Sequence, residues 1–272
     1  MSDNRAIGVF DSGLGGLTVV KELMKTLPNE NIVYFGDTGR VPYGTRSVET
    51  IKKYARQDEQ FLLNQDVKLI IAACGTVSSV ASDTANDLPV PFFEVVSHAA
   101  KAAVKATKNG KIAVIGTNAT VKSCQHEKVI KSIMPSAQVL NQSCTLFVPL
   151  VEEGWYAADD VVVLETVSRY LKPVFEFGAD TLILGCTHYP ILSDAIKKIL
   201  GDEVNLINAG TSVADAVKEY LEDEGIQNDS NINCKHSFYV SDKPDSFVKQ
   251  ATVLLGRDVD GNNVQKVDIN NL

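Results

Sequence analysis

The sequence predicts an α/β protein made of two similar halves, each a mostly parallel β-sheet flanked by helices. Runs of successive apolar residues, typical of strands buried on both faces, alternate with amphipathic stretches typical of helices. The same order of strand, turn and helix occurs in the first and second parts of the chain. With 272 residues, 44% apolar and 22% charged, the chain is long enough to bury two such cores.

Five apolar runs are predicted strands: AIGVF, NIVYF, KLIIAA, KIAVIG and TLILG, which begin at residues 6, 31, 68, 111 and 181. Between them lie predicted helices, among them LTVVKELMKTL, SVETIKKYARQDEQFLLNQ and DDVVVLETVSRYLKPVFEFG, which begin at residues 17, 47 and 159. Because strands alternate with helices, the strands should run parallel. A sheet of this kind binds its ligand outside the carboxyl ends of the strands.

The C-terminal part continues with the segment VNLINAG, the helical SVADAVKEYLEDEG and the loop IQNDSNIN. The strand-like HSFYVS and the helix-like SFVKQATVLLG follow, and we expect them to return to the first half and complete it. The polar tail DVDGNNVQKVDINNL is predicted to be loosely ordered. The predicted domains are residues 1–97 together with 208–272, and residues 98–207, with the boundary between residues 97 and 108.

An internal repeat supports the division into two halves. AIGVFDSGLGGLTVVKEL resembles KIAVIGTNATVKSCQHEK, and KLIIAACGTVSS resembles TLILGCTHYPIL. Asp11 precedes Cys74 by 63 residues (74−11), and Thr117 precedes Cys186 by 69 (186−117). The similar spacing indicates an approximate two-fold relation, and the alternative is chance similarity between two strand–helix units.

Charge and composition exclude several classes of function. The net charge of −8 argues against nucleic acid or an anionic membrane as the main partner. The first residues, MSDNRAIGVF, lack the apolar core of a signal peptide, and no run approaches the ~18 apolar residues of a membrane span. We therefore expect a cytoplasmic protein that acts on a small molecule. An anionic substrate fits as well, because local backbone dipoles can outweigh the net charge.

The five cysteines are scattered and odd in number, which does not suggest a disulfide framework. Neither a Cys-x-x-Cys pair nor an HExxH motif is present, so we expect no bound metal. Cys74 and Cys186 each follow an apolar strand, where the N-terminus of a following helix favours a thiolate. The alternative is a small buried apolar residue, which we favour for Cys124, Cys144 and Cys234.

Two thiols on opposite sides of one carbon suit a specific reaction. Inverting an α-carbon requires a base that removes a proton from one face and an acid that returns one to the other. The ordinary pKa of a thiol, about 8.5, is close enough to neutrality for both roles. The matched positions of Cys74 and Cys186 in the two halves therefore predict an acid/base pair.

The first strand ends in the glycine-rich turn DSGLGG, residues 11–16, whose backbone N–H groups can converge on an anion. A dinucleotide-binding turn is one alternative, with Asp37 at a suitable distance downstream. However, Thr18 stands where that pattern requires its last glycine. An ordinary strand–helix turn is the other alternative. Asp11 is a candidate to contact a substrate ammonium, to assist Cys74 or to cap the helix.

Residues 36–45, GDTGRVPYGT, are rich in turn formers and follow the second predicted strand. Tyr43 and Gly44 are predicted to line a pocket there. Arg40 is either a partner for a substrate carboxylate or an exposed side chain.

His188 lies two residues after Cys186, close enough to polarise or protonate groups near a substrate. The alternative is a structural histidine, but the setting Cys-Thr-His-Tyr-Pro, with a proline that stiffens the turn, favours function. Glu152 is a further candidate, and its alternative is a solvated surface position.

The segments FDSGLGGLTV, GDTGRVPYG, AACGTVSS and LGCTHYP, in this order and spacing, resemble glutamate racemase. The resemblance covers nearly the whole chain from about residue 7. It implies two pseudo-symmetric α/β domains with the active site in the cleft between them. It also implies cofactor-independent interconversion of L- and D-glutamate, a role in supplying D-glutamate for peptidoglycan, and a homodimer.

The resemblance also assigns roles to residues. Cys74 and Cys186 correspond to the two catalytic bases, with Asp11 assisting Cys74 and His188 assisting Cys186. The implied substrate contacts are Asp11, Ser12, Tyr43, Gly44, Gly75, Thr76, Thr187 and His188. Asp37 and Glu152 complete the set of candidate site residues.

The sequence departs from the family at one site position. The family commonly reads Cys-Asn-Thr at the first cysteine, whereas Gly75 replaces the asparagine here. A side-chain amide contact to the substrate is therefore missing, and a backbone N–H is its substitute. Two other functions stay open: a racemase for aspartate or another amino acid, and a non-catalytic α/β protein that binds an amino acid or a nucleotide.

Overall fold

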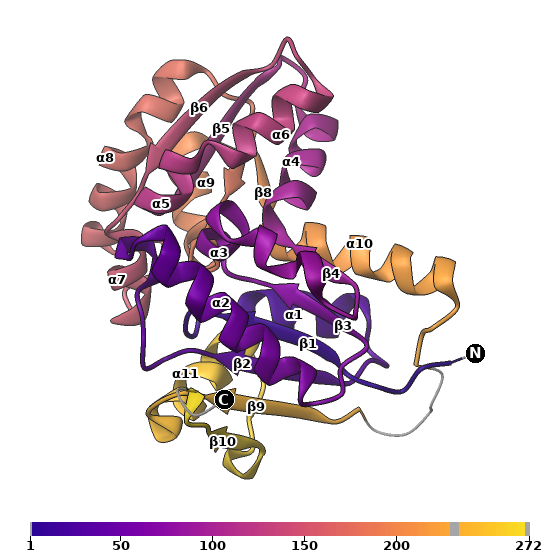
Figure 1. Ribbon diagram of the computed structural model, residues 1–272. Helices are drawn as coiled ribbons and strands as arrows, with labels where there is room; N and C mark the ends of the chain where they lie inside the picture. Colours follow the sequence, from indigo (N-terminus) through magenta and orange to yellow (C-terminus); the bar gives the residue numbers. More distant parts are fainter. Residues whose placement is uncertain (1, 229–233, 270–272) are drawn as a thin grey trace.

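The computed structural model describes residues 2–228 and 234–269, which form two parallel β-sheets covered by helices (Figure 1). The first sheet has the strand order β10-β9-β2-β1-β3-β4, and the second has the order β6-β5-β7-β8. The strands are β1 (Ile7–Asp11), β2 (Ile32–Gly36), β3 (Leu69–Ala72), β4 (Phe92–Glu94), β5 (Lys111–Gly116), β6 (Gln138–Ser143), β7 (Thr181–Leu184), β8 (Asn205–Asn208), β9 (His236–Val240) and β10 (Val264–Lys266). All pairs between these strands are parallel, which confirms the predicted fold class.

The helices are α1 (Leu17–Thr26), α2 (Val48–Leu63), α3 (Gly75–Val80), α4 (Val95–Ala106), α5 (Asn118–Ser123), α6 (Gln125–Ile133), α7 (Phe147–Glu152), α8 (Val161–Phe177), α9 (Ser193–Leu200), α10 (Ala209–Glu224) and α11 (Pro244–Leu255). The described residues also form four short 3-10 helices: η1 (Tyr43–Thr45), η2 (Ser82–Asp87), η3 (Tyr189–Leu192) and η4 (Gly261–Asn263). Among the described residues, no helix is long and apolar enough to cross a membrane.

The central strands are buried because both of their faces are covered. Every residue of β1, β2, β3 and β7 is buried. In the first sheet, β1 pairs with β2 through Ile7 and Ile32, and with β3 through Ile7 and Leu69. Continuous apolar strands such as IGVF and LIIA are typical of parallel sheets with helices on both faces.

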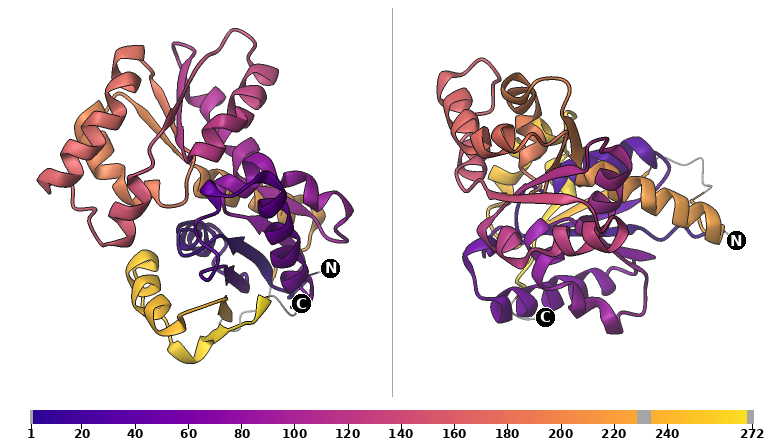
Figure 2. Two further views of the ribbon diagram at one scale, coloured as in Figure 1. Left: turned by 60° about the vertical axis from the view of Figure 1, so that its left-hand side comes forward. Right: turned by 90° about the horizontal axis from the view of Figure 1, so that it is seen from above.

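The two sheets repeat one strand order. In the first, β1 lies between β2 and β3, and β4 follows β3. In the second, β5 lies between β6 and β7, and β8 follows β7. The equivalent strands β3 and β7 each end two residues before a cysteine, Cys74 and Cys186. We call the six-stranded sheet with its helices the first half and the four-stranded sheet with its helices the second half (Figure 2).

Helix α10 joins the two halves. It starts directly after β8 of the second sheet and packs against α1 of the first half and against α4 (Figure 1). Asn208 caps its N-terminus by accepting a hydrogen bond from the backbone N–H of Gly210 at 2.9 Å. Because α10 contacts both halves, the predicted domain bounds, residues 1–97 with 208–272 and residues 98–207, stay a prediction.

The C-terminal segment completes the first sheet. Strand β9 pairs with β2, for example through Phe238 and Tyr34, so the chain returns to the first half (Figure 2). The prediction of a loosely ordered tail was wrong for its middle part, because β10 pairs with β9 and buries Val264, and Ile269 is buried as well. These two apolar residues stand among polar ones, so the composition of the tail does not indicate a strand. Residues 229–233 of the predicted loop and 270–272 of the tail lie outside the described residues.

Candidate active site

A cavity of about 330 Å³ lies between the two halves, at the carboxyl ends of their strands. Residues from both halves line it: Ser12, Val41, Pro42, Tyr43, Gly44, Thr45, Cys74, Gly75, Thr76, Thr117, Asn118, Thr145, Val148, Pro149, Glu152, Gly185, Cys186, Thr187, His188 and Tyr189. Both cysteines predicted as acid and base therefore face one space. None of these lining residues is a lysine or an arginine, and hydroxyl groups dominate its polar surface.

Cys74 lies between β3 and α3 and is 4% exposed. Its sulfur is 3.6 Å from Ser12 Oγ. Burial and the charge of Asp11 raise the pKa of Cys74 to about 12, against the lowering effect of the Val77 N–H and the Ser12 hydroxyl. The expected lowering by a helix N-terminus is outweighed, because α3 has only six residues and water is excluded. The surroundings of Cys74 therefore favour the protonated thiol.

Cys186 has a cationic neighbour instead. Its sulfur lies 3.8 Å from Nδ1 of His188, and Nε2 of His188 lies 3.3 Å from Glu152 Oε1, at ion-pair distance but without hydrogen-bond geometry. Burial would lower the pKa of His188, but the contacts with Cys186 and Glu152 and the charge of Asp11 raise it to about 10. The surroundings of His188 therefore favour its imidazolium form, and thiolates are favoured beside cations.

Asp11 ends β1 and is fully buried, and it is not among the residues that line the cavity. Its Oδ2 accepts a hydrogen bond from the Gly13 N–H at 3.1 Å, whereas Oδ1 accepts none within the described residues. Burial raises the pKa of Asp11, and the charge of His188 and nearby backbone N–H groups oppose that rise. Its negative charge raises the pKa of both Cys74 and His188. Asp11 therefore acts on the two sides of the site through its field.

Tyr43 lines the cavity, and its hydroxyl contacts two buried carboxylates. It donates to Asp37 and lies 3.0 Å from Asp58 Oδ2. Arg40 donates to Asp37 at 2.5 Å and to Asp58 at 3.0 Å. Buried carboxylates require such a cation. Asp37 consequently lies behind Tyr43 rather than on the cavity, and Arg40 is engaged by the two acids and not by the cavity.

The two halves approach each other closely at glycines around the cavity. A Cβ at Gly75 would lie 2.3 Å from the carbonyl oxygen of Gly185 in the second half, and a Cβ at Gly44 would lie 3.0 Å from Thr117 Cβ. Between these points, the hydroxyls of Thr76 and Thr117 are hydrogen-bonded across the halves at 3.1 Å. Gly75 therefore differs from the family's asparagine in two ways. It offers no side-chain amide to a substrate, and in this arrangement no side chain fits at its position.

The structure brings most of the predicted site residues together. Those that line the cavity are Ser12, Tyr43, Gly44, Cys74, Gly75, Thr76, Glu152, Cys186, Thr187 and His188, whereas Asp11 and Asp37 do not. Sequence reasoning missed Thr117, Asn118 and Thr145. They follow β5 and β6, so the rule that parallel sheets bind ligands at the carboxyl ends of their strands could have found them.

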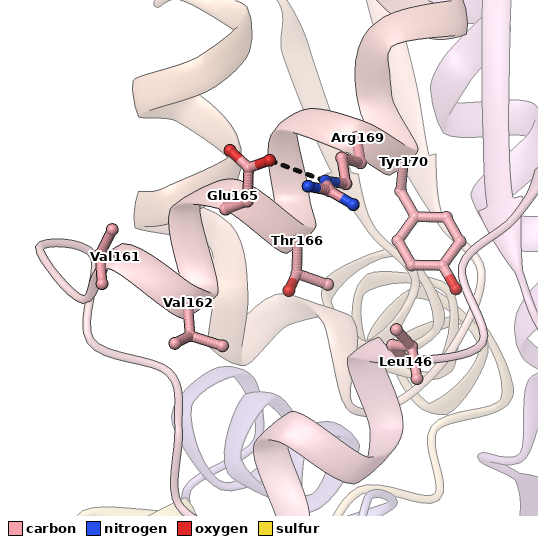
Figure 3. Close-up of a pocket in the computed structure, with 7 residues that line it drawn as sticks. All are labelled: Leu146, Val161, Val162, Glu165, Thr166, Arg169 and Tyr170. Carbon is pink, nitrogen blue, oxygen red and sulfur yellow. Dashed lines mark hydrogen bonds and ion pairs between the residues drawn. The ribbon is translucent and has the colours of Figure 1, made fainter.

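A second hollow, of about 520 Å³, lies on the outer surface of the second half beside α8 (Figure 3). It is lined by Leu146, Val161, Val162, Glu165, Thr166, Arg169 and Tyr170, and its two charged residues pair with each other at 2.7 Å. These residues include neither a cysteine nor a histidine. The hollow therefore lacks the paired cysteines predicted as acid and base, and the cavity between the halves is the candidate active site.

Comparison with known proteins is consistent with this geometry. The profile of the Asp/Glu/Hydantoin racemase family matches residues 7–217 of this chain. The chain belongs to this family. It is therefore a racemase, an enzyme of the isomerase class, and the resemblance predicted from the four sequence motifs is confirmed.

Individual members of the family match over almost the full length. Glutamate racemase from Syntrophus aciditrophicus is 45% identical over 264 residues, which cover 97% of this chain and 96% of that protein. The crystal structure of glutamate racemase from Francisella tularensis in complex with D-glutamate has a TM-score of 0.90 and 37% identity, covering 99% of this chain and 100% of that one. Glutamate racemase from Bacillus anthracis has a TM-score of 0.93 and 37% identity, covering 98% of each chain.

Proposed function

We propose that this enzyme interconverts L- and D-glutamate without a cofactor, using Cys74 and Cys186 as the two acid/base groups. One observation carries the proposal: the two cysteines follow equivalent strands of the two halves by two residues and line one cavity. The names of the relatives support glutamate as the substrate, and so does the related Francisella tularensis structure, which holds D-glutamate. Asp11 and His188 are the proposed assisting residues.

The proposed reaction moves protons between two sulfurs through one carbon. A thiolate on one side removes the α-proton and becomes a thiol, and the electron pair of the C–H bond is left on the α-carbon and its carboxylate. The thiol on the other side then donates its proton to the opposite face and becomes a thiolate, which inverts the centre. No proton is gained or lost overall, and the reverse direction exchanges the two roles.

The groups around the two sulfurs support one resting state for this pair. Cys186 has the His188 imidazolium at 3.8 Å, whereas Cys74 is buried near the carboxylate of Asp11, which keeps its proton in place. In the proposed resting enzyme, a thiolate at Cys186 therefore faces a thiol at Cys74. Catalysis starts directly with the enantiomer whose α-proton points at Cys186. For the other enantiomer, the proton must first move from Cys74 to Cys186.

Substrate recognition in this cavity relies on neutral donors. The lining includes the hydroxyls of Ser12, Thr45, Thr76, Thr117, Thr145 and Thr187 and the amide of Asn118. Backbone N–H groups and hydroxyls can bind carboxylates in a site that excludes water. Because His188 is the cation closest to the reacting centre, the pocket suits a small zwitterion with one additional carboxylate. Glu152, which lies on the same surface, is a proposed partner for His188 rather than for a substrate carboxylate.

The decisive experiment measures exchange at the α-carbon. The purified protein, with no added cofactor, is incubated with L-glutamate in heavy water, and the α-proton signal is followed by NMR together with the circular dichroism of the solution. We expect loss of the α-proton and of optical activity. Unchanged spectra would exclude the racemase and favour a non-catalytic protein that binds an amino acid or nucleotide. Aspartate in the same assay tests the alternative substrate.

Single cysteine variants test the two-thiol mechanism. Cys74→Ser and Cys186→Ser should each lose at least ~10²-fold in kcat, because the ordinary pKa of a hydroxyl is too high for either role. Cys124→Ser is the matched control, since Cys124 contacts the carbonyl oxygen of Val121 and lies outside the cavity. Two active single variants would show that the mechanism is wrong.

The cellular role and the homodimer rest on the family alone. We propose that the product D-glutamate serves peptidoglycan synthesis, and expression of the gene should allow a D-glutamate-requiring bacterium to grow without the supplement. Light scattering coupled to size-exclusion chromatography tests the dimer, which would give about twice the 29.5 kDa mass of one chain.

A further inference from the structure

The glycine-rich turn after β1 contacts the opposite half of the molecule. Thr18, in the first turn of α1, lies with its hydroxyl 2.8 Å from the carbonyl oxygen of Thr187 and 2.9 Å from that of Gly15. Thr187 stands between Cys186 and His188, so this hydrogen bond reaches the loop that carries the second thiol and its cation. Thr18 is only 7% exposed, which shields the bond from water.

Gly15 provides the space for this contact. A Cβ at Gly15 would lie 2.2 Å from Thr187 Oγ1 and 2.6 Å from both Cε1 and Nδ1 of the His188 ring. The ring atom that faces this glycine, Nδ1, is the same atom that lies 3.8 Å from the sulfur of Cys186. The turn thus forms the surface on which the His188 ring rests.

This arrangement explains why the turn departs from a dinucleotide-binding pattern. Thr18 occupies the position at which that pattern has a glycine, and its hydroxyl binds a carbonyl of the other half instead of leaving space for a phosphate. The small residues of the turn leave space for the loop that carries Thr187 and His188.

We propose that Thr18 is a positioning residue: by holding the Thr187 carbonyl, it fixes the His188 ring against Cys186. The first half thereby sets the position of the histidine beside the thiol of the second half. This inference rests on the proposed function, because it concerns the residue pair assigned there as thiolate and imidazolium. The charged groups around His188 are Asp11 from β1, Glu152 from α7 and Cys186 from its own loop. Removing the Thr18 hydroxyl leaves all three in place.

The test compares Thr18→Ala with Thr18→Ser, two variants that differ by a single oxygen atom. Alkylation of each cysteine by iodoacetamide is followed by mass spectrometry between pH 6 and 10, with Cys124 in the same molecule as the reference thiol. Wild type and Thr18→Ser should modify Cys186 at a lower pH than Cys124. Thr18→Ala should move the Cys186 profile upward by about one pH unit, a ~10-fold slower reaction near neutrality.

Thr211→Ala is the matched control. It removes a threonine hydrogen bond of similar length, 3.1 Å to Glu22 Oε2, from the contact between α10 and α1, away from His188. It should leave the Cys186 profile unchanged. A Thr18→Ala profile equal to that of wild type would overturn the positioning role while leaving the racemase intact. A wild-type Cys186 no more reactive than Cys124 would overturn both this inference and the proposed thiolate.

Discussion

Replacing Gly75 by alanine tests how closely the two halves of the enzyme must approach. Its added Cβ would lie 2.3 Å from the carbonyl oxygen of Gly185, whereas ordinary contacts of this kind begin at 3.4 Å. The backbone before Cys186 would thus have to retreat by about 1.1 Å (3.4−2.3), because a backbone carbonyl cannot swing away as a side chain can. Gly75 does not adopt a left-handed conformation and starts α3, so alanine is otherwise well suited to the position.

A displacement of ~1 Å at a reacting group costs ~10²-fold in rate. We therefore expect kcat/KM of Gly75→Ala to fall ~10²-fold, which corresponds to ~2.7 kcal/mol of barrier. The assay is the circular dichroism of glutamate solutions started from either enantiomer. Gly261→Ala is the control, since its Cβ would meet only Val248 Cγ2, at 3.8 Å. If Gly75→Ala keeps kcat/KM within about threefold of wild type, the halves do not need this contact during catalysis and the steric reasoning fails.

Two further predictions concern stability and pH. Burial raises the pKa of Glu59 to about 7 despite its hydrogen bond from Thr84, so ionising Glu59 destabilises the folded state as pH rises from about 4.5 through 7. Glu59→Gln should therefore raise the melting temperature at pH 8 and leave it nearly unchanged at pH 4, and an equal shift at both values would contradict this. His188, with its pKa raised to about 10, stabilises the folded state fully below pH 6.5 and loses that effect as pH rises through 10. Calorimetry should accordingly show a steeper loss of stability between pH 7 and 10 in wild type than in His188→Gln, and parallel curves would show that the histidine is not protonated.

Sequence patterns predicted the central strands because their signal is local. A strand such as LIIA is apolar at every position because it is buried on both faces, and no other part of the chain is needed to recognise it. Strands at the edges of the sheets carry a mixed pattern, since one side meets solvent. That is why β6, with the sequence QVLNQS and no fully buried residue, and β10, with one buried valine, were not predicted.

The site was predictable where a residue follows a buried strand. Ser12 comes directly after one, and Cys74 and Cys186 each come two residues after one, and parallel strands end at the same edge of their sheet. Positions that depend on contacts between the halves were not predictable in this way. The hydroxyl of Tyr43 points to Asp58, fifteen residues further along the chain, and this contact forms only when α2 packs under the loop. The contact between Gly15 and the His188 ring joins residues more than 170 positions apart.

The two halves share a backbone plan but differ in the charges around their sulfurs, and the reaction tolerates that difference. L- and D-glutamate have equal free energies, so kcat/KM must be the same in both directions whatever the environments of Cys74 and Cys186. An acidic neighbour at one sulfur and a histidine at the other can therefore make kcat and KM differ between the two directions, but not kcat/KM. In the proposed mechanism, the enantiomer that meets the resting thiolate reacts without a prior proton shift, so the asymmetry should appear as unequal KM values balanced by unequal kcat values. A symmetric fold can thus contain an asymmetric pair of bases without favouring either product.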